Sequence, residues 1–463
     1  MEYMIDLSLL KGSQPQAFEE IVDFFINGKN NILLLSGAAG TGKTKLLGFV
    51  MQELINRGMG SIIVMTFTGE AAKIAQEQSV VESNEIEYST LHSGFGLQPN
   101  KNSDKLRFKR NLKAGKVDKK YILFIDEASQ IDNELFGYAY EESMNHKKVV
   151  FIGDKYQIPP IGMNEAVVFD DSFAADYGIQ VVTLTEPVRQ NVGSPILDTG
   201  DNIRERIKRP ILFSERISRE NEKGEKLLHL EYNKKAIYDL CKDFFLSKEY
   251  HDDHKFFKLI AWTNREVDFW NNEVRMLLFG KKPENLEYNK VRKIVVGEKI
   301  LSASPYIDGR KIIFSTNELL EVLDYSLSTV NLYGISFKHY IVKVRYFKGS
   351  EPCEYDVNVI HDDDHQKFYD LLERQANNIK KAIAEKGGSR ETGIMWAEWW
   401  NVKEFFCEIR YNYARTAHTA QGSTFQNGVV LESDMSGNNK VYERNRIIYV
   451  GITRFSKTCI NFY

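Results

Sequence analysis

A glycine-rich loop between an apolar segment and an amphipathic segment constrains the fold of this chain more than any other feature. Residues 32–35 are all apolar and predict a buried strand. Residues 43–56 repeat their apolar side chains at helical spacing, and Gly58 follows as a stop signal. The loop over residues 37–44 reads Gly-Ala-Ala-Gly-Thr-Gly-Lys-Thr. A strand, a loop of this pattern and a helix together predict a phosphate-binding loop.

The chemistry of this loop indicates a nucleotide and magnesium site. Its backbone N–H groups turn toward phosphate oxygens, and the N-terminus of the following helix adds positive potential. Lys43 is placed to reach the outer phosphates, and the Thr44 hydroxyl is placed to ligate Mg²⁺. The alternative is a glycine-rich turn in an ordinary strand-helix unit. The predicted nucleotide contacts are Gly37, Ala38, Ala39, Gly40, Thr41, Gly42, Lys43 and Thr44.

Two adjacent acids follow a second buried-strand pattern at residues 121–125. Open parallel sheets gather their ligands at the carboxyl ends of the strands, where Asp126 and Glu127 stand. We predict that Asp126 holds the magnesium ion and that Glu127 orients the attacking water as a base. The alternative for Glu127 is a carboxylate at a helix start. The second acid favours hydrolysis of the nucleotide over phosphate transfer to a small acceptor.

Further apolar runs extend this pattern into an α/β fold. The runs at residues 62–65, 149–152 and 181–184 are continuous rather than alternating in polarity. Continuous runs are typical of parallel strands that are buried on both faces. Longer helical patterns separate the runs, so we expect a parallel sheet with helices on both sides.

A second α/β-like stretch opens near Val192. Its strand patterns lie at residues 259–262 and 428–431. Between them, residues 296–355 alternate apolar and polar side chains, which predicts small antiparallel strands inserted into the second unit. Residues 362–386 return to helical periodicity before a pair of glycines.

The composition bounds the class of protein and its environment. The 61 Lys and Arg against 64 Asp and Glu give a net charge of −3, and 43% hydrophobic residues are ordinary for a globular chain, which excludes wholesale disorder. No apolar run approaches the ~20 residues of a membrane span. The four cysteines are scattered, and no basic segment precedes an apolar core at the N-terminus. We expect no membrane association, no secretory signal and a reducing, cytoplasmic location.

Six segments, in order along nearly the whole chain, resemble the motifs of superfamily 1 helicases. The resemblance is strongest to the 5′-to-3′ branch, 1B, which contains the Dda-type enzymes of T-even phages and the RecD-type enzymes. The sequence departs from the family where Thr66-Phe67 replaces Ala-Pro and where Phe455-Ser456 replaces basic residues. The six segments are Gln14 with Ala17 and Phe18, residues 66–72, 89–92, 153–160, 420–424 and 449–454.

The resemblance implies roles that no local pattern assigns. Gln14 would read adenine, Gly422 would contact the nucleotide, and Gln157 would sense the terminal phosphate and report it to the neighbouring domain. Arg189 and Arg454 would stabilise charge on the transferred phosphoryl group from across a domain cleft. The implied nucleic-acid contacts are Thr66, Thr68, His92, Thr263, Asn264, His418, Thr419 and Gln421.

The main basic patch is residues 101–120, with nine Lys or Arg against Asp104 and Asp118, a local excess of +7. In the 1B branch an insertion at this place forms a β-hairpin, the pin, that splits the duplex. Phe108 would stack on the base at the fork, where stacking contributes about 1–3 kcal/mol. The alternatives are a solvated charged face for the segment and packing of Phe108 against its own domain.

The implied fold is α/β, with two RecA-like P-loop motor domains built on parallel sheets flanked by helices. Trp396, Trp399 and Trp400 recur at helical spacing, and we interpret them as a packed helix face that braces the inserted barrel against the pin. The domains are residues 1–92 and 121–190 for the first motor, 93–120 for the pin, 191–297 and 412–463 for the second motor, and 298–411 for an inserted SH3-like β-barrel with a helical extension.

The resemblance implies an ATP-dependent DNA helicase that uses Mg²⁺, moves 5′ to 3′ on single-stranded DNA and unwinds duplex junctions. We expect DNA-stimulated ATP hydrolysis, a monomer, single-strand-binding or replisome proteins as partners, a role in replication or recombination, and a phage origin. The alternatives are an RNA helicase of the same superfamily, a P-loop kinase or nucleotide switch without nucleic acid, and a DNA-binding protein without catalysis. A kinase would have no use for Gln157, Gln421 and Arg454.

Overall fold

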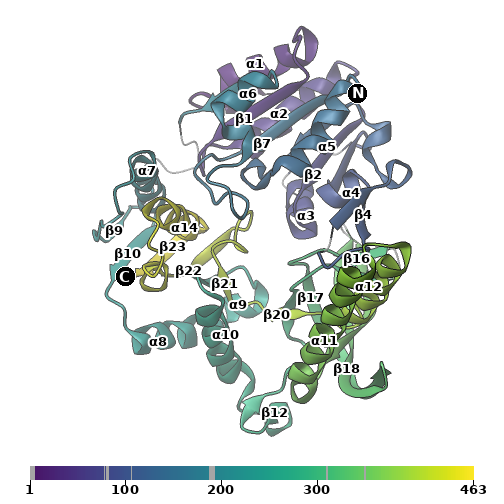
Figure 1. Ribbon diagram of the computed structural model, residues 1–463. Helices are drawn as coiled ribbons and strands as arrows, with labels where there is room; N and C mark the ends of the chain where they lie inside the picture. Colours follow the sequence, from purple (N-terminus) through teal and green to yellow (C-terminus); the bar gives the residue numbers. More distant parts are fainter. Residues whose placement is uncertain are drawn as a thin grey trace.

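The computed structural model describes residues 6–77, 79, 83–105, 107–186, 193–308, 311–348 and 351–463. Two parallel sheets form the centres of two lobes, and an antiparallel sheet lies beside them (Figure 1). We call residues 6–186 the first lobe, the part built on the other parallel sheet the second lobe, and the antiparallel sheet with its two long helices the insertion. No helix within these described ranges has both the length and the apolar character needed to cross a bilayer.

The first lobe contains a six-stranded parallel sheet in the order β3-β2-β6-β7-β1-β8. Each predicted strand of this region forms one of its strands, and the predicted helix over residues 43–56 is α2. The strands are β1 (Ile32–Gly37), β2 (Ile62–Thr66), β3 (Ile86–Thr90), β6 (Ile122–Ile125), β7 (Lys148–Gly153) and β8 (Gln180–Leu184). The helices are α1 (Gln14–Ile26), α2 (Lys43–Asn56), α3 (Gly69–Glu77), α4 (Leu91–Gly94), α5 (Asn133–Met144) and α6 (Asp171–Asp176).

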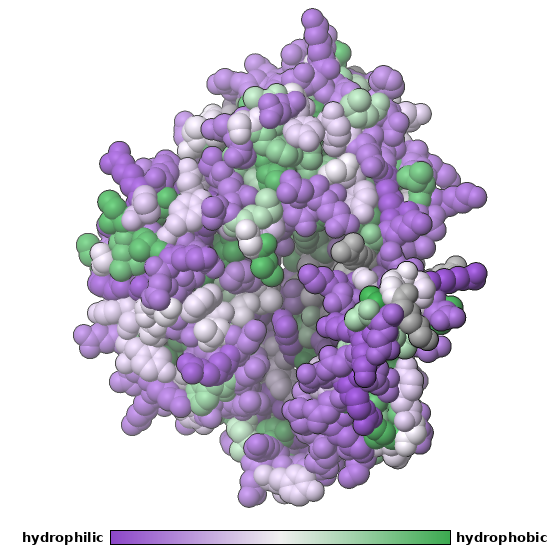
Figure 2. Space-filling model, viewed as in Figure 1, coloured by the Kyte–Doolittle hydropathy of each residue, from purple (hydrophilic) through white to green (hydrophobic). Residues whose placement is uncertain are grey.

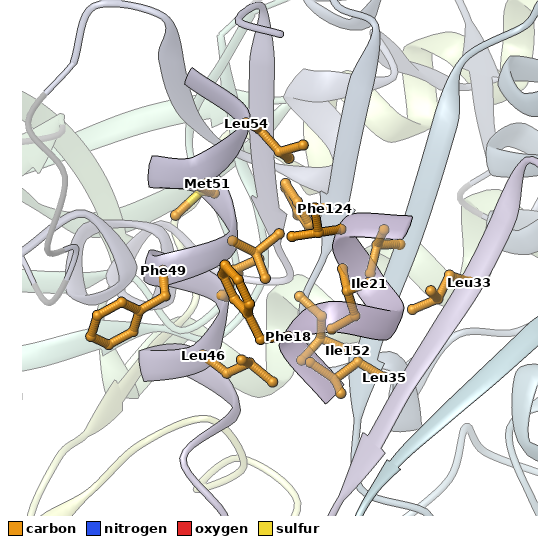
Figure 3. Packing of buried hydrophobic residues seen from close by; sticks show 14 of the residues in the cluster. Phe18, Ile21, Leu33, Leu35, Leu46, Phe49, Met51, Leu54, Phe124 and Ile152 are labelled. Atoms are coloured by element: carbon orange, nitrogen blue, oxygen red, sulfur yellow. The ribbon is translucent and has the colours of Figure 1, made fainter. Parts of the chain in front are cut away.

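The side chains of this sheet alternate between two buried cores, which explains why the apolar runs are continuous. Leu33 and Leu35 of β1 pack with α1 and α2 (Figure 3). Ile32 and Leu34 face the opposite core, which α5 covers. Helices on both faces are the arrangement that a parallel sheet requires. The parallel strands also bring the carboxyl ends of β1, β6 and β7 to one edge of the sheet.

The second lobe has a six-stranded sheet in the order β21-β11-β22-β23-β10-β9. Its neighbours pair in parallel except β9 with β10, and the strands predicted at residues 259–262 and 428–431 are confirmed as β11 and β22. The strands are β9 (Arg219–Glu220), β10 (Lys226–Leu230), β11 (Phe257–Ala261), β21 (Ala414–Thr416), β22 (Phe425–Leu431) and β23 (Phe455–Phe462). The helices are α7 (Pro195–Lys208), α8 (Lys234–Phe245), α9 (Lys248–Asp252), α10 (Asn264–Phe279), α13 (Glu432–Met435) and α14 (Val441–Thr453).

The insertion contains an antiparallel sheet in the order β19-β18-β17-β14-β20, so the predicted antiparallel strands are confirmed. Its edge strands approach each other, because the Cys407 N–H donates to the Asn358 carbonyl at 2.6 Å. The strands are β14 (Lys299–Ser302), β15 (Tyr306–Asp308), β16 (Lys311–Phe314), β17 (Leu319–Leu332), β18 (Ile335–Lys348), β19 (Glu351–Ile360) and β20 (Ile409–Tyr411). The helices are α11 (Asp362–Lys386), which covers the predicted range, and α12 (Arg390–Lys403).

A buried ion pair fixes the insertion to the second lobe. Arg275 of α10 donates from Nε to Glu298 Oε1 at 2.7 Å and from Nη2 to Oε2 at 3.0 Å. Both residues are almost completely buried, and Glu298 lies one residue before β14. Tyr413 also donates its hydroxyl to Glu298 Oε1 at 3.1 Å. The carboxylate is therefore fully hydrogen-bonded at the point where the chain enters the insertion.

We predict that Arg275→Ala destabilises the protein by about 3–5 kcal/mol, because it leaves the Glu298 carboxylate buried without a cation. Denaturant unfolding with the fluorescence of the buried tryptophans measures the loss. The exposed pair Lys343 and Glu354, 3.0 Å apart, supplies the control, since Lys343→Ala should leave the midpoint unchanged. Equal midpoints for Arg275→Ala and the unaltered protein would refute the assignment.

Candidate functional site

The glycine-rich loop lies at the carboxyl edge of the first sheet. It begins at the end of β1 and leads directly into α2. Gly40 and Gly42 have φ values of +85° and +75°, which glycine adopts without strain. Asp126 follows β6 at the same edge, and Asp154 follows β7, which lies between β6 and β1. The sheet order therefore places both carboxylates beside the loop.

Two predicted nucleotide contacts are engaged with the loop itself. Lys43 donates from Nζ to the carbonyls of Gly37 and Ala38, at 2.7 and 3.0 Å. Gln14 is buried, and its amide donates to the Thr41 and Gly42 carbonyls, at 3.1 and 3.3 Å. The Gln14 side chain thus holds the loop in shape, and its contact with adenine stays a prediction.

Thr44 is exposed in the first turn of α2, where its hydroxyl is accessible to a ligand. A metal ion at Thr44 and Asp126 would take its remaining ligands from phosphate and water, because no group of three metal-binding side chains occurs in the described ranges.

The acid pair at the end of β6 carries concentrated negative charge. The Glu127 N–H donates to Asp126 Oδ1 at 2.8 Å, and Glu127 has a left-handed backbone with φ of +57°. Burial raises the pKa of Asp126. Burial and the neighbouring Asp126 raise the pKa of Glu127 to about 7, while Arg454 and Lys43 oppose this shift. This environment fits a general base poised near neutral pH, and a pair of acids that a divalent cation would stabilise.

The second lobe contacts the glycine-rich loop directly. Tyr449 of α14 donates its hydroxyl to Asp154 Oδ2 at 2.5 Å. The Ala39 N–H donates to the same Asp154 oxygen and to the Tyr449 hydroxyl, both at 3.1 Å. Tyr449 and Asp154 are both about 1% exposed. One loop N–H, one carboxylate and one phenol therefore join the two lobes at the predicted phosphate site.

The segment that contains Gln157 is also held from the second lobe. Arg446 donates from Nη1 to the carbonyls of Lys155, at 2.7 Å, and Gln157. Gln421 donates its amide to the Ile158 carbonyl at 3.0 Å. The Gln157 side chain accepts a long hydrogen bond, 3.4 Å, from the Ser129 hydroxyl next to the acid pair. This loop thus lies between the acids and α14.

Of the two predicted arginines, Arg454 lies at the site and Arg189 is outside the described residues. Arg454 is buried and donates to the Ser423 carbonyl at 3.3 Å. It is close enough to Glu127 to lower that residue's pKa, against the larger effect of burial. Gly422 lies on the same side, since a Cβ added there would be 3.4 Å from Glu127 Oε1. Arg454 and Gly422 therefore approach the acid pair from the second lobe.

A groove lies between the lobes, where the surface is hollowed (Figure 2). Two neighbouring cavities share Asn317, Arg415 and Thr419 in their walls. The larger has a volume of about 260 Å³. Five of the predicted nucleic-acid contacts line the two cavities: Thr68, Asn264, His418, Thr419 and Gln421.

Two other predicted contacts do not present their hydroxyls to this groove. Thr66 is about 1% exposed and donates its hydroxyl to the Thr68 carbonyl at 2.9 Å, and its contact with a strand stays a prediction. Thr263 caps α10 and donates to Asp434 Oδ1 at 2.8 Å. Both side chains order the backbone beside the groove.

A two-stranded hairpin lies in the basic segment, formed by β4 (Leu97–Asn100) and β5 (Arg107–Arg110). Phe108 is half-buried at the edge of the first-lobe core that α5 covers, and its ring lies edge-on to His92 with centroids 4.6 Å apart. Phe108 therefore packs against its own domain in this structure, as the alternative interpretation holds, and its stacking on a base stays a prediction. His92 lies with this hairpin, outside the two cavities.

The hairpin tip is attached to the insertion. Trp400 donates its indole N–H to the Ser103 carbonyl at 2.7 Å, and Lys101 pairs with Glu404. Trp396, Trp399 and Trp400 are all buried, as the packed-face interpretation predicted. The insertion thus braces the hairpin.

Two residues at the lobe contact were not singled out from the sequence. Tyr449 and Asp154 both stand inside motifs that resemble the family. The motifs indicated that these segments are functional, but they did not indicate that these two side chains join the lobes. Arg204 of α7 lies 5.7 Å from the Tyr156 ring, close to the same contact. No motif marks Arg204, and its position follows from the packing of α7 on α14.

We predict that Glu127→Gln stabilises the protein at about pH 8 and has little effect near pH 5. The folded pKa of Glu127, about 7, lies above its ordinary value of 4.5. Below pH 4.5 the Glu127 carboxyl is protonated in both the folded and the unfolded protein, so the substitution changes little. Above about pH 7 the carboxylate is charged in both, and its burial destabilises the folded protein. Melting temperatures across this range measure the difference. Glu373→Gln, on the exposed face of α11, is the control, and an equal shift at both pH values would contradict the prediction.

Comparisons with known proteins show what the whole chain is similar to. Residues 20–163 match the family model of an AAA domain. The chain is 26% identical over 455 residues to the ATP-dependent DNA helicase dda of Enterobacteria phage T4, covering 96% of this chain and 97% of the relative. It is 22% identical to the RecBCD enzyme subunit RecD of Buchnera aphidicola subsp. Schizaphis graminum, covering 92% and 69%.

The crystal structure of Pif1 helicase from Candida albicans aligns with 99% of this chain and 95% of its own, at 16% identity and a TM-score of 0.48, a similarity too low to define a shared fold by itself. The six motifs in order, the similarity to the phage protein over nearly its full length and the similarity to RecD over 69% of its length are independent of that alignment. The chain is thus similar to helicases of the Dda and RecD type, which resemble the same superfamily 1B branch as its six motifs do.

Proposed function

We propose that this chain is an ATP-dependent DNA helicase that moves 5′ to 3′ on single-stranded DNA and unwinds duplex junctions. The observation that carries the proposal is the contact at Ala39, where the second lobe reaches the phosphate loop through Tyr449. A nucleotide that binds the loop must change this contact, because its phosphates need the same N–H group. The groove lies between the same two lobes, so nucleotide binding and strand binding act on one interface.

The residues at the carboxyl edge have the chemistry for ATP hydrolysis. Lys43 would leave its carbonyl partners for the outer phosphates, and Glu127 would take the proton of the attacking water. Thr44 and Asp126 would hold a magnesium ion, which would supply positive charge to offset the phosphates. Arg454, and Arg189 by resemblance, would stabilise the transition state from the second lobe. Arginines in this position are worth roughly a thousand-fold or more in turnover.

Gln157 and Gln421 would connect hydrolysis to movement. The Gln157 segment accepts hydrogen bonds from Arg446 of α14 and from Gln421, which lies in the turn after β21. A change at the terminal phosphate would therefore alter contacts to the second lobe and shift one wall of the groove. A kinase or nucleotide switch needs no such connection to a distant half of the chain.

The domain division, the SH3-like barrel and the pin belong to the same proposal. We infer a pin at residues 93–120 because the basic hairpin is braced by α12. The names of the relatives favour DNA over RNA as the strand. A monomeric state, single-strand-binding or replisome partners, a role in replication or recombination, a phage origin and a cytoplasmic location are further predictions of the resemblance.

We predict that single-stranded DNA strongly stimulates ATP hydrolysis and that Lys43→Ala lowers the stimulated rate by more than about a hundred-fold, because the outer phosphates lose their cation. A coupled ATPase assay with and without oligonucleotide measures both. Lys45→Ala is the matched control, since Lys45 is exposed two residues further along α2. Equal turnover with and without DNA would remove the helicase proposal.

We predict that Phe108→Ala slows unwinding more than translocation, because the hairpin loses an aromatic ring at the fork. Unwinding is measured on duplexes with a 5′ or a 3′ single-strand overhang, and translocation on a labelled single strand. The unaltered protein should open only the 5′-overhang substrate. Normal unwinding by Phe108→Ala would remove the pin role, and preference for the 3′ overhang would reverse the proposed direction.

A further inference from the structure

Asn317 occupies a constrained position in the insertion. It lies in the turn between β16 and β17, and its φ of +62° is left-handed. Its backbone N–H donates to the Ser302 carbonyl of β14 at 2.8 Å. Only glycine, asparagine and aspartate adopt this conformation readily. Glycine would satisfy the backbone alone, so the side chain of Asn317 invites a separate explanation.

The Asn317 side chain lines both cavities of the groove. It is adjacent to Phe67 and Thr68 of the first lobe in one cavity, and to Asn264 of the second lobe in the other. Its Oδ1 is buried and has no hydrogen-bond partner among the described residues. Buried acceptors without a partner are uncommon, and a missing ligand is one reason for them.

The turn is held firmly against the first lobe. Glu318 is 8% exposed and packs on the N-terminus of α3, since a Cβ added to Gly69 would be 2.4 Å from Glu318 Oε2. A carboxylate is favourable at a helix N-terminus. Lys73 of α3 lies 4.0 Å from the centroid of the Phe347 ring of β18. These contacts place Asn317 at the seam between the first lobe and the insertion.

The chemistry of the unpartnered atom indicates which part of a strand it would meet. Phosphate oxygens only accept hydrogen bonds, whereas Oδ1 needs a donor. Unpaired DNA bases carry amino and imino donors on their edges. The exposed Arg410 in the wall of the larger cavity is the kind of group that meets phosphates. The wall of the larger cavity therefore offers Arg410 to the phosphate backbone of a strand and Asn317 to one of its bases.

We propose that Asn317 hydrogen-bonds to the edge of an unpaired base in the groove, an inference that rests on the proposed function. The cavity beside Glu127 is about 50 Å³, smaller than a nucleotide, so the lobes separate further as the strand enters. The contact lets the insertion hold the strand at a base while the lobes grip its backbone.

The test compares Asn317→Gly with Asn289→Gly on two oligomers of equal length. Asn289 has the same φ of +62° and is exposed in the turn between β12 (Leu286–Glu287) and β13 (Lys290–Val291), so glycine suits both positions. Fluorescence anisotropy gives the affinity for oligo(dT) and for an abasic oligomer. Asn317→Gly should bind oligo(dT) about three- to ten-fold more weakly and the abasic oligomer as well as the unaltered protein does. Asn289→Gly should match the unaltered protein on both.

Two outcomes would overturn the proposal. Unchanged affinity of Asn317→Gly for oligo(dT) would exclude the contact, and an equal loss on both oligomers would show an effect on the backbone path instead of a base. These outcomes are distinguishable from failure of the proposed function, in which the unaltered protein itself would show neither strand binding nor DNA-stimulated hydrolysis.

Discussion

The hydrogen bonds that converge on the Ala39 N–H are the interaction on which the rest of the structure depends. Asp154 comes from the first lobe and Tyr449 from the second, and both are buried around a group that faces the phosphate site. Burial and the adjacent Asp154 raise the pKa of Tyr449 well above its ordinary value, so the phenol keeps its proton and can donate. The lobes are therefore joined where a nucleotide would bind, and filling that site changes the joint itself.

The acid pair explains why the site needs groups from both lobes. Asp126 and Glu127 are adjacent and partly buried; burial raises the pKa of both carboxyl groups, and the charge of Asp126 further raises the pKa of Glu127. Lys43 and Arg454 provide the opposing charge, one from the loop and the other from the end of α14. A first lobe alone would hold the acids and the loop but lack Arg454. Complete charge compensation thus requires the two lobes to be together, which is a physical basis for making hydrolysis depend on their arrangement.

Local patterns predicted the elements well and individual contacts less well. The helix over residues 43–56 follows from side-chain periodicity alone, and the buried strands follow from runs such as residues 32–35. Asn317 carries no such signal, because its role depends on a turn that packs against α3, far away in the sequence. Tyr449 and Asp154 stand in motifs that resemble the family, but their contact joins residues 295 positions apart and follows from no local pattern. For Phe108 the sequence left two interpretations open, stacking on a base and packing against its own domain, and its ring lies edge-on to His92 while stacking stays a prediction.

The insertion gives the groove a third wall that is fixed at both ends. The buried pair Arg275 and Glu298 joins it to the second lobe, while Glu318 and Trp400 join it to α3 and to the hairpin tip in the first. Movement between the lobes must therefore strain or shift one of these attachments. The ion pair has two hydrogen bonds and full burial, whereas the hairpin contact, made by the Trp400 indole N–H and by Lys101 with Glu404 and Asn401, is less deeply buried. The weaker attachments lie on the first lobe, so the insertion should move with the second lobe and carry its wall along the strand.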